Sequence, residues 1–269
     1  MTTQQKIEYL LNKDKYSFDD LVILVEVLRS DIGCPWDREQ THKSIRKDLI
    51  EETYEVIEAI DTESPSLMRE ELGDVLLQVV FHARIEEEEG RCDINDVAND
   101  ICAKLIHRHP HVFGSVVAET SDKVLSNWEQ IKSEEKERVT VTDKLRAIPP
   151  MLPALMRAEK VGKKASCFDF ADADAVMDKL GEELGELTEA ISEGNTEHTE
   201  EEMGDLLLTL TSLCRKLGID PEVALNKATD KFIDRFEVVE NVTIERKMNI
   251  KEMSMPELDA IWDEIKHKN

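Results

Sequence analysis

Five acidic residues occur twice in this chain, in the same order and with the same spacing. The two sets are Glu51, Glu52, Glu55, Glu71, Asp74 and Glu182, Glu183, Glu186, Glu202, Asp205. Each member of the second set lies 131 positions after its counterpart in the first. Such a register indicates an internal duplication, and it predicts two modules of the same fold.

Within each set, the acids lie in segments with the apolar spacing of an α-helix. Residues three and four positions apart share one face of a helix, so Glu182, Glu183 and Glu186 point the same way. Gly194-Asn195 favours a turn between two such helices. Glu186 and Glu202 are each eight residues from Gly194, or about 12 Å from the tip of a helical hairpin. We therefore expect up to five carboxylates to face one another across each hairpin.

Carboxylates this close repel one another and raise each other's pKa unless a cation lies between them. Oxygen-only ligands suit Mg²⁺, with Mn²⁺ as a substitute. The sequence therefore predicts a magnesium site in each module. Gly73 and Gly204 lie inside the predicted helices, where a glycine costs about 0.5–1 kcal/mol relative to alanine. We expect a neighbouring group to approach closely at both positions.

Two other interpretations of the acids were weighed. Most glutamates are solvated helix surface, but the repeat in register argues against that for both sets. A carboxylate-bridged di-iron bundle needs a Glu-x-x-His step on each of two helices. The chain has Glu39 to His42, beside Pro35-Trp36, and Glu264 to His267 near its end, and neither repeats at the offset of 131. Oxygen-only coordination is favoured.

The charge balance limits the partners. The chain has 59 acidic and 34 basic residues and a net charge of −25, which argues against a nucleic-acid partner. Five cysteines without a CxxC pair are typical of free thiols in a reducing compartment. No signal pattern and no apolar run near 18 residues is present. We expect no membrane association and a cytoplasmic location.

The helical patterns predict an all-α protein of two tandem modules. We expect a polar, frayed N-terminal extension (1–16), a first module (17–138), a linker (139–150) and a second module (151–269). The linker loses the helical period and ends in Pro149-Pro150. Residues 33–37 are too rich in breakers for helix, and strand-like alternation is absent. Helices are expected near 17–28, 41–61, 65–89, 93–109, 121–138, 151–166, 171–193, 196–217, 221–247 and 254–267.

Candidate substrate contacts come from cations and a tryptophan. Lys231 and Arg235 share one helix face, and Lys104 and Arg108 have the same spacing in the first module. Beside bound metals, such a pair suits a polyphosphate. Trp262, which Trp128 echoes in the first module, is a candidate to stack on a base. The alternatives are solvated cations and a core-filling tryptophan.

Other catalytic motifs are missing or weak. The chain has no GxxxxGK[ST] phosphate loop and no recognisable Ser/His/Asp or Cys/His set. His107, His109 and His111 surround Pro110 and form either a metal site or a structural or substrate-edge corner after a helix end. The run has no counterpart in the second module, so the corner is favoured.

With these motifs laid out, the chain resembles the MazG family of nucleoside triphosphate pyrophosphohydrolases. The shared motifs are EExxE followed by ExxD, together with segments 33–42, 109–114 and 164–170, and the resemblance spans about residues 17–267. It implies Mg²⁺-dependent hydrolysis of a broad class of NTPs and dNTPs to NMP and pyrophosphate. It also implies four-helix-bundle cores completed by a homodimer.

The resemblance assigns roles residue by residue. The implied metal ligands are Glu183, Glu186, Glu202 and Asp205 in the second module and Glu52, Glu55, Glu71 and Asp74 in the first. The implied nucleotide contacts are Lys179, Lys231, Arg235 and Trp262.

One position departs from the pattern. Asp48 stands four residues before Glu52, where the second module has Lys179 before Glu183. The second module is therefore the expected main catalyst, with Glu182 or a ligand carboxylate orienting the attacking water. The competing interpretation is a non-catalytic helical module that senses nucleotide or metal, which would bind NTP without releasing NMP.

Overall fold

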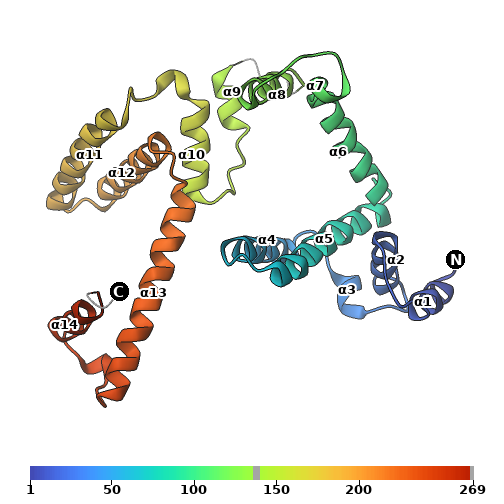
Figure 1. The fold of residues 1–269 in the computed structure, drawn as a ribbon, viewed down its shortest axis with the longest axis horizontal. Helices are drawn as coiled ribbons and strands as arrows, with labels where there is room; N and C mark the ends of the chain where they lie inside the picture. The colour runs from blue at the N-terminus through green and yellow to red at the C-terminus, as the bar shows by residue number, and fades with distance from the viewer. Residues whose placement is uncertain (136–139, 267–269) are drawn as a thin grey trace. The chain divides into compact units, whose positions relative to one another are not determined.

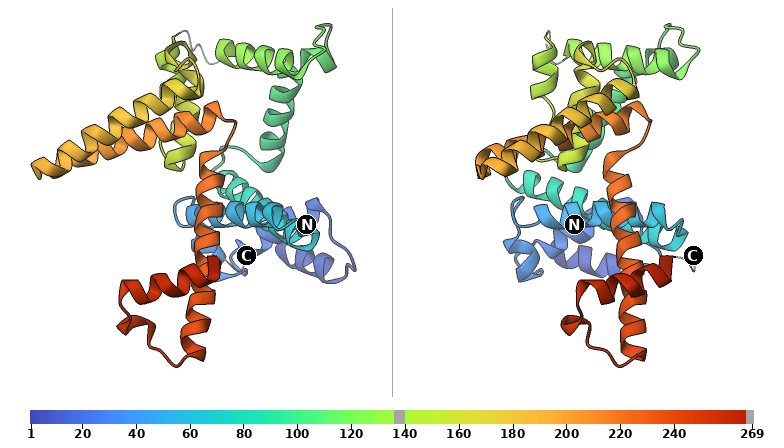
Figure 2. Two further views of the ribbon diagram at one scale, coloured as in Figure 1. Left: turned by 60° about the vertical axis from the view of Figure 1, so that its left-hand side comes forward. Right: turned by 90° about the vertical axis from the view of Figure 1, so that its left-hand side faces the viewer.

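A computed structural model describes residues 1–135 and 140–266 of the chain (Figures 1 and 2). It divides into two compact units, Met1–Glu129 and Gln130–Asn269. The described residues form α-helices and short 3₁₀ helices and no strand, which confirms the all-α class and the two helical modules. The predicted module limits stay predictions. Residues 136–138 and His267, at the ends of two predicted helices, lie outside the described residues.

Unit 1 begins with three short helices, α1 (Thr3–Leu11), α2 (Phe18–Leu28) and α3 (Pro35–Glu39). The expected frayed extension is instead a helix, because Thr2 and Gln5 form a capping box at its start. The expectation of no helix over residues 33–37 was also wrong. Pro35 occupies the first turn of α3, where its missing N–H costs nothing. At the start of α2, Ser17 and Asp20 form a capping box.

The first acidic set lies on a helical hairpin made by α4 (Arg46–Asp61) and α5 (Pro65–Glu88). The two helices run side by side in every view (Figures 1 and 2). Ser64 caps α5, and Pro65 occupies its first turn as predicted. The hairpin packs on α2 through a core of Val25, Ile45, Val80, Phe81 and Ile85.

Arg29 fixes the segment that leads into α4. Its side chain is only 8% exposed and lies over the ring of Phe81, 5.1 Å from the centroid. Nη1 donates to the carbonyls of Asp37 (2.6 Å) and Gln40 (3.1 Å), and Nη2 donates to Glu88 on α5 at 2.8 Å. One guanidinium therefore joins α2, the α3 segment and α5.

The rest of unit 1 follows α5 as α6 (Ile94–Arg108), α7 (Pro110–Phe113) and α8 (Ser121–Glu135), the last of which crosses the division between the units. Asp93 caps α6 through a capping box. The ring of His109 meets Trp128 edge-on at 5.0 Å. The helix end at Pro110 is therefore a packed aromatic corner, as the sequence favours.

Unit 2 contains α9 (Val141–Arg146), α10 (Ala154–Lys164), the 3₁₀ helix η1 (Ser166–Phe168), and the hairpin of α11 (Ala173–Glu193) and α12 (Thr196–Lys216). The capped helix α9 falls where an irregular linker was expected, because Thr140 and Asp143 form a capping box. Between α11 and α12, Gly194 has φ 71° and ends α11 in the left-handed conformation. Asn195 then caps α12, so the predicted turn is confirmed.

Beyond the hairpin, α13 (Pro221–Glu245) leads through η2 (Ile250–Glu252) to α14 (Met255–Lys266). Asp220 caps α13 at the predicted start of this helix. α13 and α14 pack through Val239, Ile261 and Ile265. Trp262 lies in the same contact, with its ring 5.4 Å from that of Phe232.

Both hairpins leave an apolar stripe exposed. Leu72, Leu76 and Val79 recur at helical spacing on α5, yet a single chain leaves them exposed, Leu72 by 51%. Their counterparts 131 positions later, Met203, Leu207 and Leu210, are exposed as well. The described residues of one chain bury the other face of each hairpin, including Val80 of α5.

Candidate metal and substrate site

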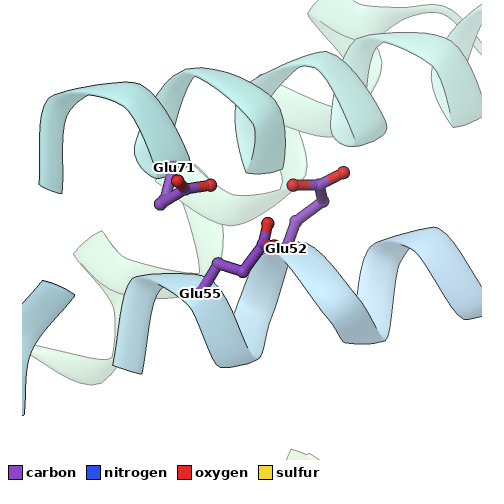
Figure 3. A group of neighbouring side chains, drawn as sticks. All are labelled: Glu52, Glu55 and Glu71. Atoms are coloured by element: carbon purple, nitrogen blue, oxygen red, sulfur yellow. The ribbon is translucent and has the colours of Figure 1, made fainter. Parts of the chain in front are cut away.

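In unit 1 the hairpin brings three carboxylates together. Glu52 and Glu55 on α4 point toward Glu71 on α5 (Figure 3). Each offers an oxygen, and these oxygens all lie within 4.8 Å of one another. Three oxygen donors from two facing helices suit a hard divalent cation, so the donor set fits Mg²⁺ or Mn²⁺.

These carboxylates shift each other's protonation. Burial raises the pKa of Glu52 to about 7, assisted by a hydrogen bond with Glu55 and repulsion from Asp74 and Glu71. The pKa of Glu71, which is 8% exposed, is raised by burial and by repulsion from Glu55. Burial and mutual repulsion therefore disfavour the charged forms of these two carboxylates in the absence of a cation.

The second hairpin places the equivalent oxygens in the same way. One oxygen each from Glu183, Glu186 and Glu202 lies within 4.8 Å of the others. Glu183 is 6% exposed, whereas Glu186 is open to solvent. The triad joins the middle of α11 to the first half of α12, as the sequence predicts.

Two basic side chains accompany this second triad. Lys179 Nζ lies 3.1 Å from Glu182 Oε2 and 3.1 Å from Glu183 Oε1. These contacts raise the pKa of Lys179, the hydrogen bond with Glu182 most of all. His198 Nε2 lies 3.2 Å from Glu202 Oε1. The pKa of His198 is raised, mainly by Glu193 and also by Glu202.

The two sites therefore differ in charge while sharing their carboxylates. The positions that hold Lys179 and His198 in the second hairpin hold Asp48 and Leu67 in the first. Sequence reasoning had singled out Lys179 but missed His198. The available signal was its place four residues before Glu202, on the same helix face.

Not every predicted site residue joins a triad. Asp74 and Asp205 fall outside the groups of mutually close oxygens, and Asp205 is exposed. Glu182 is exposed and meets Lys179. The predicted close approach at Gly73 and Gly204 was wrong for one chain, because a Cβ added at either would meet no atom within 4 Å. These glycines lie on the hairpin face that the chain leaves open.

The predicted contacts on α13 and α14 also lie apart from the carboxylates. Lys231 is exposed, and Arg235 and Trp262 are half-buried. Among the residues that the structure describes, none of the three makes a hydrogen bond or ion pair with the second triad. Trp262 packs instead on Phe232.

His42, the histidine of the first Glu-x-x-His step, pairs with residues of α5. His42 Nδ1 lies 2.7 Å from His82 Nδ1, and His42 Nε2 lies 2.7 Å from Glu86 Oε1. Over the described residues, neither group of mutually close ligand atoms includes a histidine, although His198 Nε2 lies 3.2 Å from Glu202 Oε1. Oxygen-only coordination stays a prediction. His267 of the second Glu-x-x-His step lies outside the described residues.

Comparison with known protein families decides what this duplicated site belongs to. The sequence profile of the MazG nucleotide pyrophosphohydrolase domain matches residues 40–113 and again residues 171–252. This chain belongs to the MazG family. Each match contains one carboxylate triad, so both hairpins are MazG domains, and the resemblance seen in the motifs is confirmed.

Full-length relatives agree with this assignment. A Thermotoga maritima protein named nucleoside triphosphate pyrophosphohydrolase/pyrophosphatase MazG is 45% identical over 251 residues, covering 93% of this chain and 95% of that protein. An Escherichia coli nucleoside triphosphate pyrophosphohydrolase is 42% identical over 255 residues, covering 93% of this chain and 97% of its own length. The tandem arrangement of two MazG domains thus extends over nearly the whole of both relatives.

Proposed function

We propose that this protein hydrolyses nucleoside triphosphates to NMP and pyrophosphate, cutting the anhydride between the α and β phosphates. The observation that carries the proposal is the carboxylate triad of Glu183, Glu186 and Glu202 with Lys179 beside it, in a chain whose long relatives bear that enzymatic name. Because the protein has a large negative charge, a polyanionic substrate needs both a metal ion and local cations in order to bind. We take the substrate class to include NTPs and dNTPs.

Mg²⁺ is the proposed cofactor, held by Glu183, Glu186, Glu202 and Asp205, with Mn²⁺ as a substitute. When bound, such an ion lowers the pKa of water and withdraws charge from phosphate oxygens. In the first hairpin the ligands would be Glu52, Glu55, Glu71 and Asp74. Each triad supplies three oxygens within 4.8 Å, and the aspartates are the fourth donors.

The chain's own side chains then act on the substrate. Glu182, exposed beside Lys179, or a ligand carboxylate orients the attacking water. The ammonium of Lys179 contacts a phosphate. Lys231 and Arg235 offset the charge that develops on the leaving pyrophosphate, and Trp262 contacts the nucleoside. Because Asp48 replaces this lysine in the first hairpin, the second hairpin is the main catalyst.

A homodimer is part of the proposal. The exposed apolar stripes of both hairpins, such as Leu207 and Leu210 on α12, need a covering surface, and a second copy supplies one of matching character. Two hairpins, one from each copy, would then form a four-helix bundle. The second copy would also bring Lys231 and Arg235 to the carboxylates.

We place the enzyme in the cytoplasm, since all five cysteines are free thiols. None of the helices over residues 1–135 and 140–266 is both long and apolar enough to span a bilayer.

The test is a product assay with two matched variants. Each NTP is incubated with Mg²⁺ and the purified protein, and NMP and pyrophosphate are quantified. Glu202→Gln should lower kcat about a hundredfold or more, with an unchanged circular dichroism spectrum. The equivalent change in the first hairpin, Glu71→Gln, should have a much smaller effect. Wild-type turnover in Glu202→Gln would refute the assignment, and binding of NTP without product would favour the non-catalytic sensor.

A further inference from the structure

An apolar pocket of about 510 Å³ opens on unit 2, between α10, η1 and the C-terminal half of α12. Its lining includes Phe168, Phe170, Leu208, Thr209 and Ser212. The volume falls within the range of about 300–1,000 Å³ typical of small-molecule sites. We propose that this pocket holds the nucleobase of the substrate, with Phe168 as the side chain on which the base stacks. The inference rests on the proposed hydrolysis of nucleoside triphosphates.

The pocket continues the face of α12 that carries the carboxylates. Thr209 and Ser212 follow Asp205 by four and seven residues, so all three share one helix face. Thr209 lies about 6 Å beyond Asp205 along the helix, and Ser212 about 10 Å beyond it. A triphosphate held at the carboxylates therefore places its nucleoside at the level of the pocket.

Lys179 lies at the level where the two parts of the site meet. It is fifteen residues before Gly194, and Thr209 is fifteen after it, so they stand at the same height on the two helices of the hairpin. The carboxylates are closer to the turn and the pocket is farther from it. This order is the one that a nucleotide requires, with metal-bound phosphates, a cation and then the base.

Phe168 is presented as a platform by an anchored segment. The side chain is 96% exposed, while the next residue, Asp169, is held by Arg215 Nη1 at 2.8 Å and Lys216 Nζ at 2.9 Å. Arg215 lies against α10, because a Cβ at Gly162 would stand 3.2 Å from its Nε. The backbone beside the aromatic ring is thus fixed to α12 before any ligand binds, which lowers the entropy cost of stacking.

The chemistry of the pocket favours acceptance of every base. Asp169 is paired with its two cations, so the other polar side-chain groups on the walls are the Cys167 thiol and the hydroxyls of Thr209 and Ser212. Ser212 Oγ donates to the carbonyl of Leu208 at 3.3 Å. The Thr209 hydroxyl has no hydrogen-bond partner among the described residues. A hydroxyl both donates and accepts, and stacking on an aromatic ring suits any base. Recognition by Phe168 should therefore be strong and nonselective.

The first hairpin offers a natural contrast. Phe81 occupies the position equivalent to Ser212, and it is buried beneath the guanidinium of Arg29. The space that is open beside α12 is filled by this ring beside α5. The position of the first hairpin that is equivalent to Ser212 is therefore occupied by a buried aromatic ring.

The experiment compares Phe168→Ala, Phe168→Trp and a control, Trp36→Ala, which removes an exposed aromatic ring from the first module. KM and kcat are measured for ATP, GTP, CTP and UTP. Equilibrium binding of an α,β-imido nucleoside triphosphate is measured by calorimetry. Inhibition by tripolyphosphate, which has no base, reports on the phosphate site. Loss of a base stack predicts that Phe168→Ala raises KM and the analogue Kd between about 5-fold and 100-fold. Phe168→Trp and Trp36→Ala should stay near wild type.

The inhibition constant of tripolyphosphate separates the outcomes. An unchanged constant with weakened nucleotide binding supports the base pocket. Unchanged nucleotide binding in Phe168→Ala overturns it, and so does an equal loss of nucleotide and tripolyphosphate binding, because that would place Phe168 at the phosphates. Either result leaves the proposed reaction standing, whereas turnover by Glu202→Gln would remove the reaction itself.

Discussion

Lys179 and Glu183 form an ion pair across one turn of α11, with Nζ 3.1 Å from Oε1. The residues 131 positions earlier, Asp48 and Glu52, are both acidic. One hairpin therefore carries a built-in cation beside its carboxylates and the other carries a further negative charge.

Reversing the charge of Asp48 should relieve the first hairpin. Asp48→Lys places an ammonium one turn before Glu52, and we expect a gain of about 0.5–1 kcal/mol in the free energy of unfolding without Mg²⁺. The melting temperature should rise by about 2–4 °C. Asp100→Lys, which makes the same charge change on an exposed position of α6, is the control. An equal rise in both variants would show that net charge alone is responsible.

Removing one carboxylate should alter the pH dependence of stability. Because the pKa of Glu52 is raised to about 7 from an ordinary value near 4.5, the folded state holds a proton that the unfolded state has lost between these pH values. The free energy of unfolding must therefore fall as pH rises from about 4.5 to 7. Without Mg²⁺ the wild type should melt higher at pH 5.5 than at pH 8, and Glu52→Gln should flatten this difference.

Millimolar Mg²⁺ should raise the melting temperature of the wild type, whereas rising pH lowers it. The ion replaces the proton between the carboxylates, so it should raise the wild-type melting temperature most at pH 8. Differential scanning calorimetry at pH 5.5 and pH 8, with Mg²⁺ or with EDTA, measures this shift in melting temperature. The absence of any Mg²⁺-dependent shift in the wild type would count against both metal sites.

The anchor of the η1 segment should be a point of acid sensitivity. Arg215 and Lys216 hold the pKa of Asp169 well below its usual range, so its contribution to stability is present above about pH 4 and lost as pH falls further. Asp169→Asn should cost about 2–4 kcal/mol at pH 7, because it leaves largely buried cations unpaired. The difference in urea midpoint between the wild type and Asp169→Asn should therefore be smaller at pH 3 than at pH 7. Asp230→Asn, on an exposed part of α13, should show no such difference at pH 7.

Two glycines of the second hairpin should respond in opposite directions to alanine. Gly194 has φ 71°, so Gly194→Ala should cost about 1 kcal/mol. Gly204 is inside α12 with no atom near an added Cβ, so Gly204→Ala should stabilise a dilute sample by about 0.5–1 kcal/mol. Thermal melts at low protein concentration compare them. A destabilised Gly204→Ala in a dilute, monomeric sample would mean that another part of the same chain approaches this face.

The sequence predicted most of the architecture because its signals are local. The helical period and the Gly194-Asn195 turn each act within a few residues, and the structure confirms both. The misses at α1 and α9 are local too, since both helices start at capping boxes that were not recognised. The prediction of no helix at α3 was based only on its helix-breaking residues, and it was wrong because Pro35 lies at the start of this helix.

The site was predictable only as far as one hairpin determines it. Equal distances from the turn brought Glu183, Glu186 and Glu202 together. The base pocket depends on the packing of η1 against α12 and on a salt bridge between residues 46 positions apart, which no periodic pattern reports. The same limit applies to the exposed Leu72 stripe, because a repeating apolar position does not reveal which molecule covers it.

The clamp at Arg29 has a consequence for how unit 1 comes apart. A single planar group holds two carbonyls of the α3 segment, a carboxylate of α5 and the ring of Phe81, so none of these contacts can open without disturbing the rest. The amide hydrogens of α2, α3 and α5 should accordingly exchange with solvent as one cooperative block. Lysine at position 29 could not reproduce the fork, and it would let the start of α4 fray independently of the hairpin that it leads into.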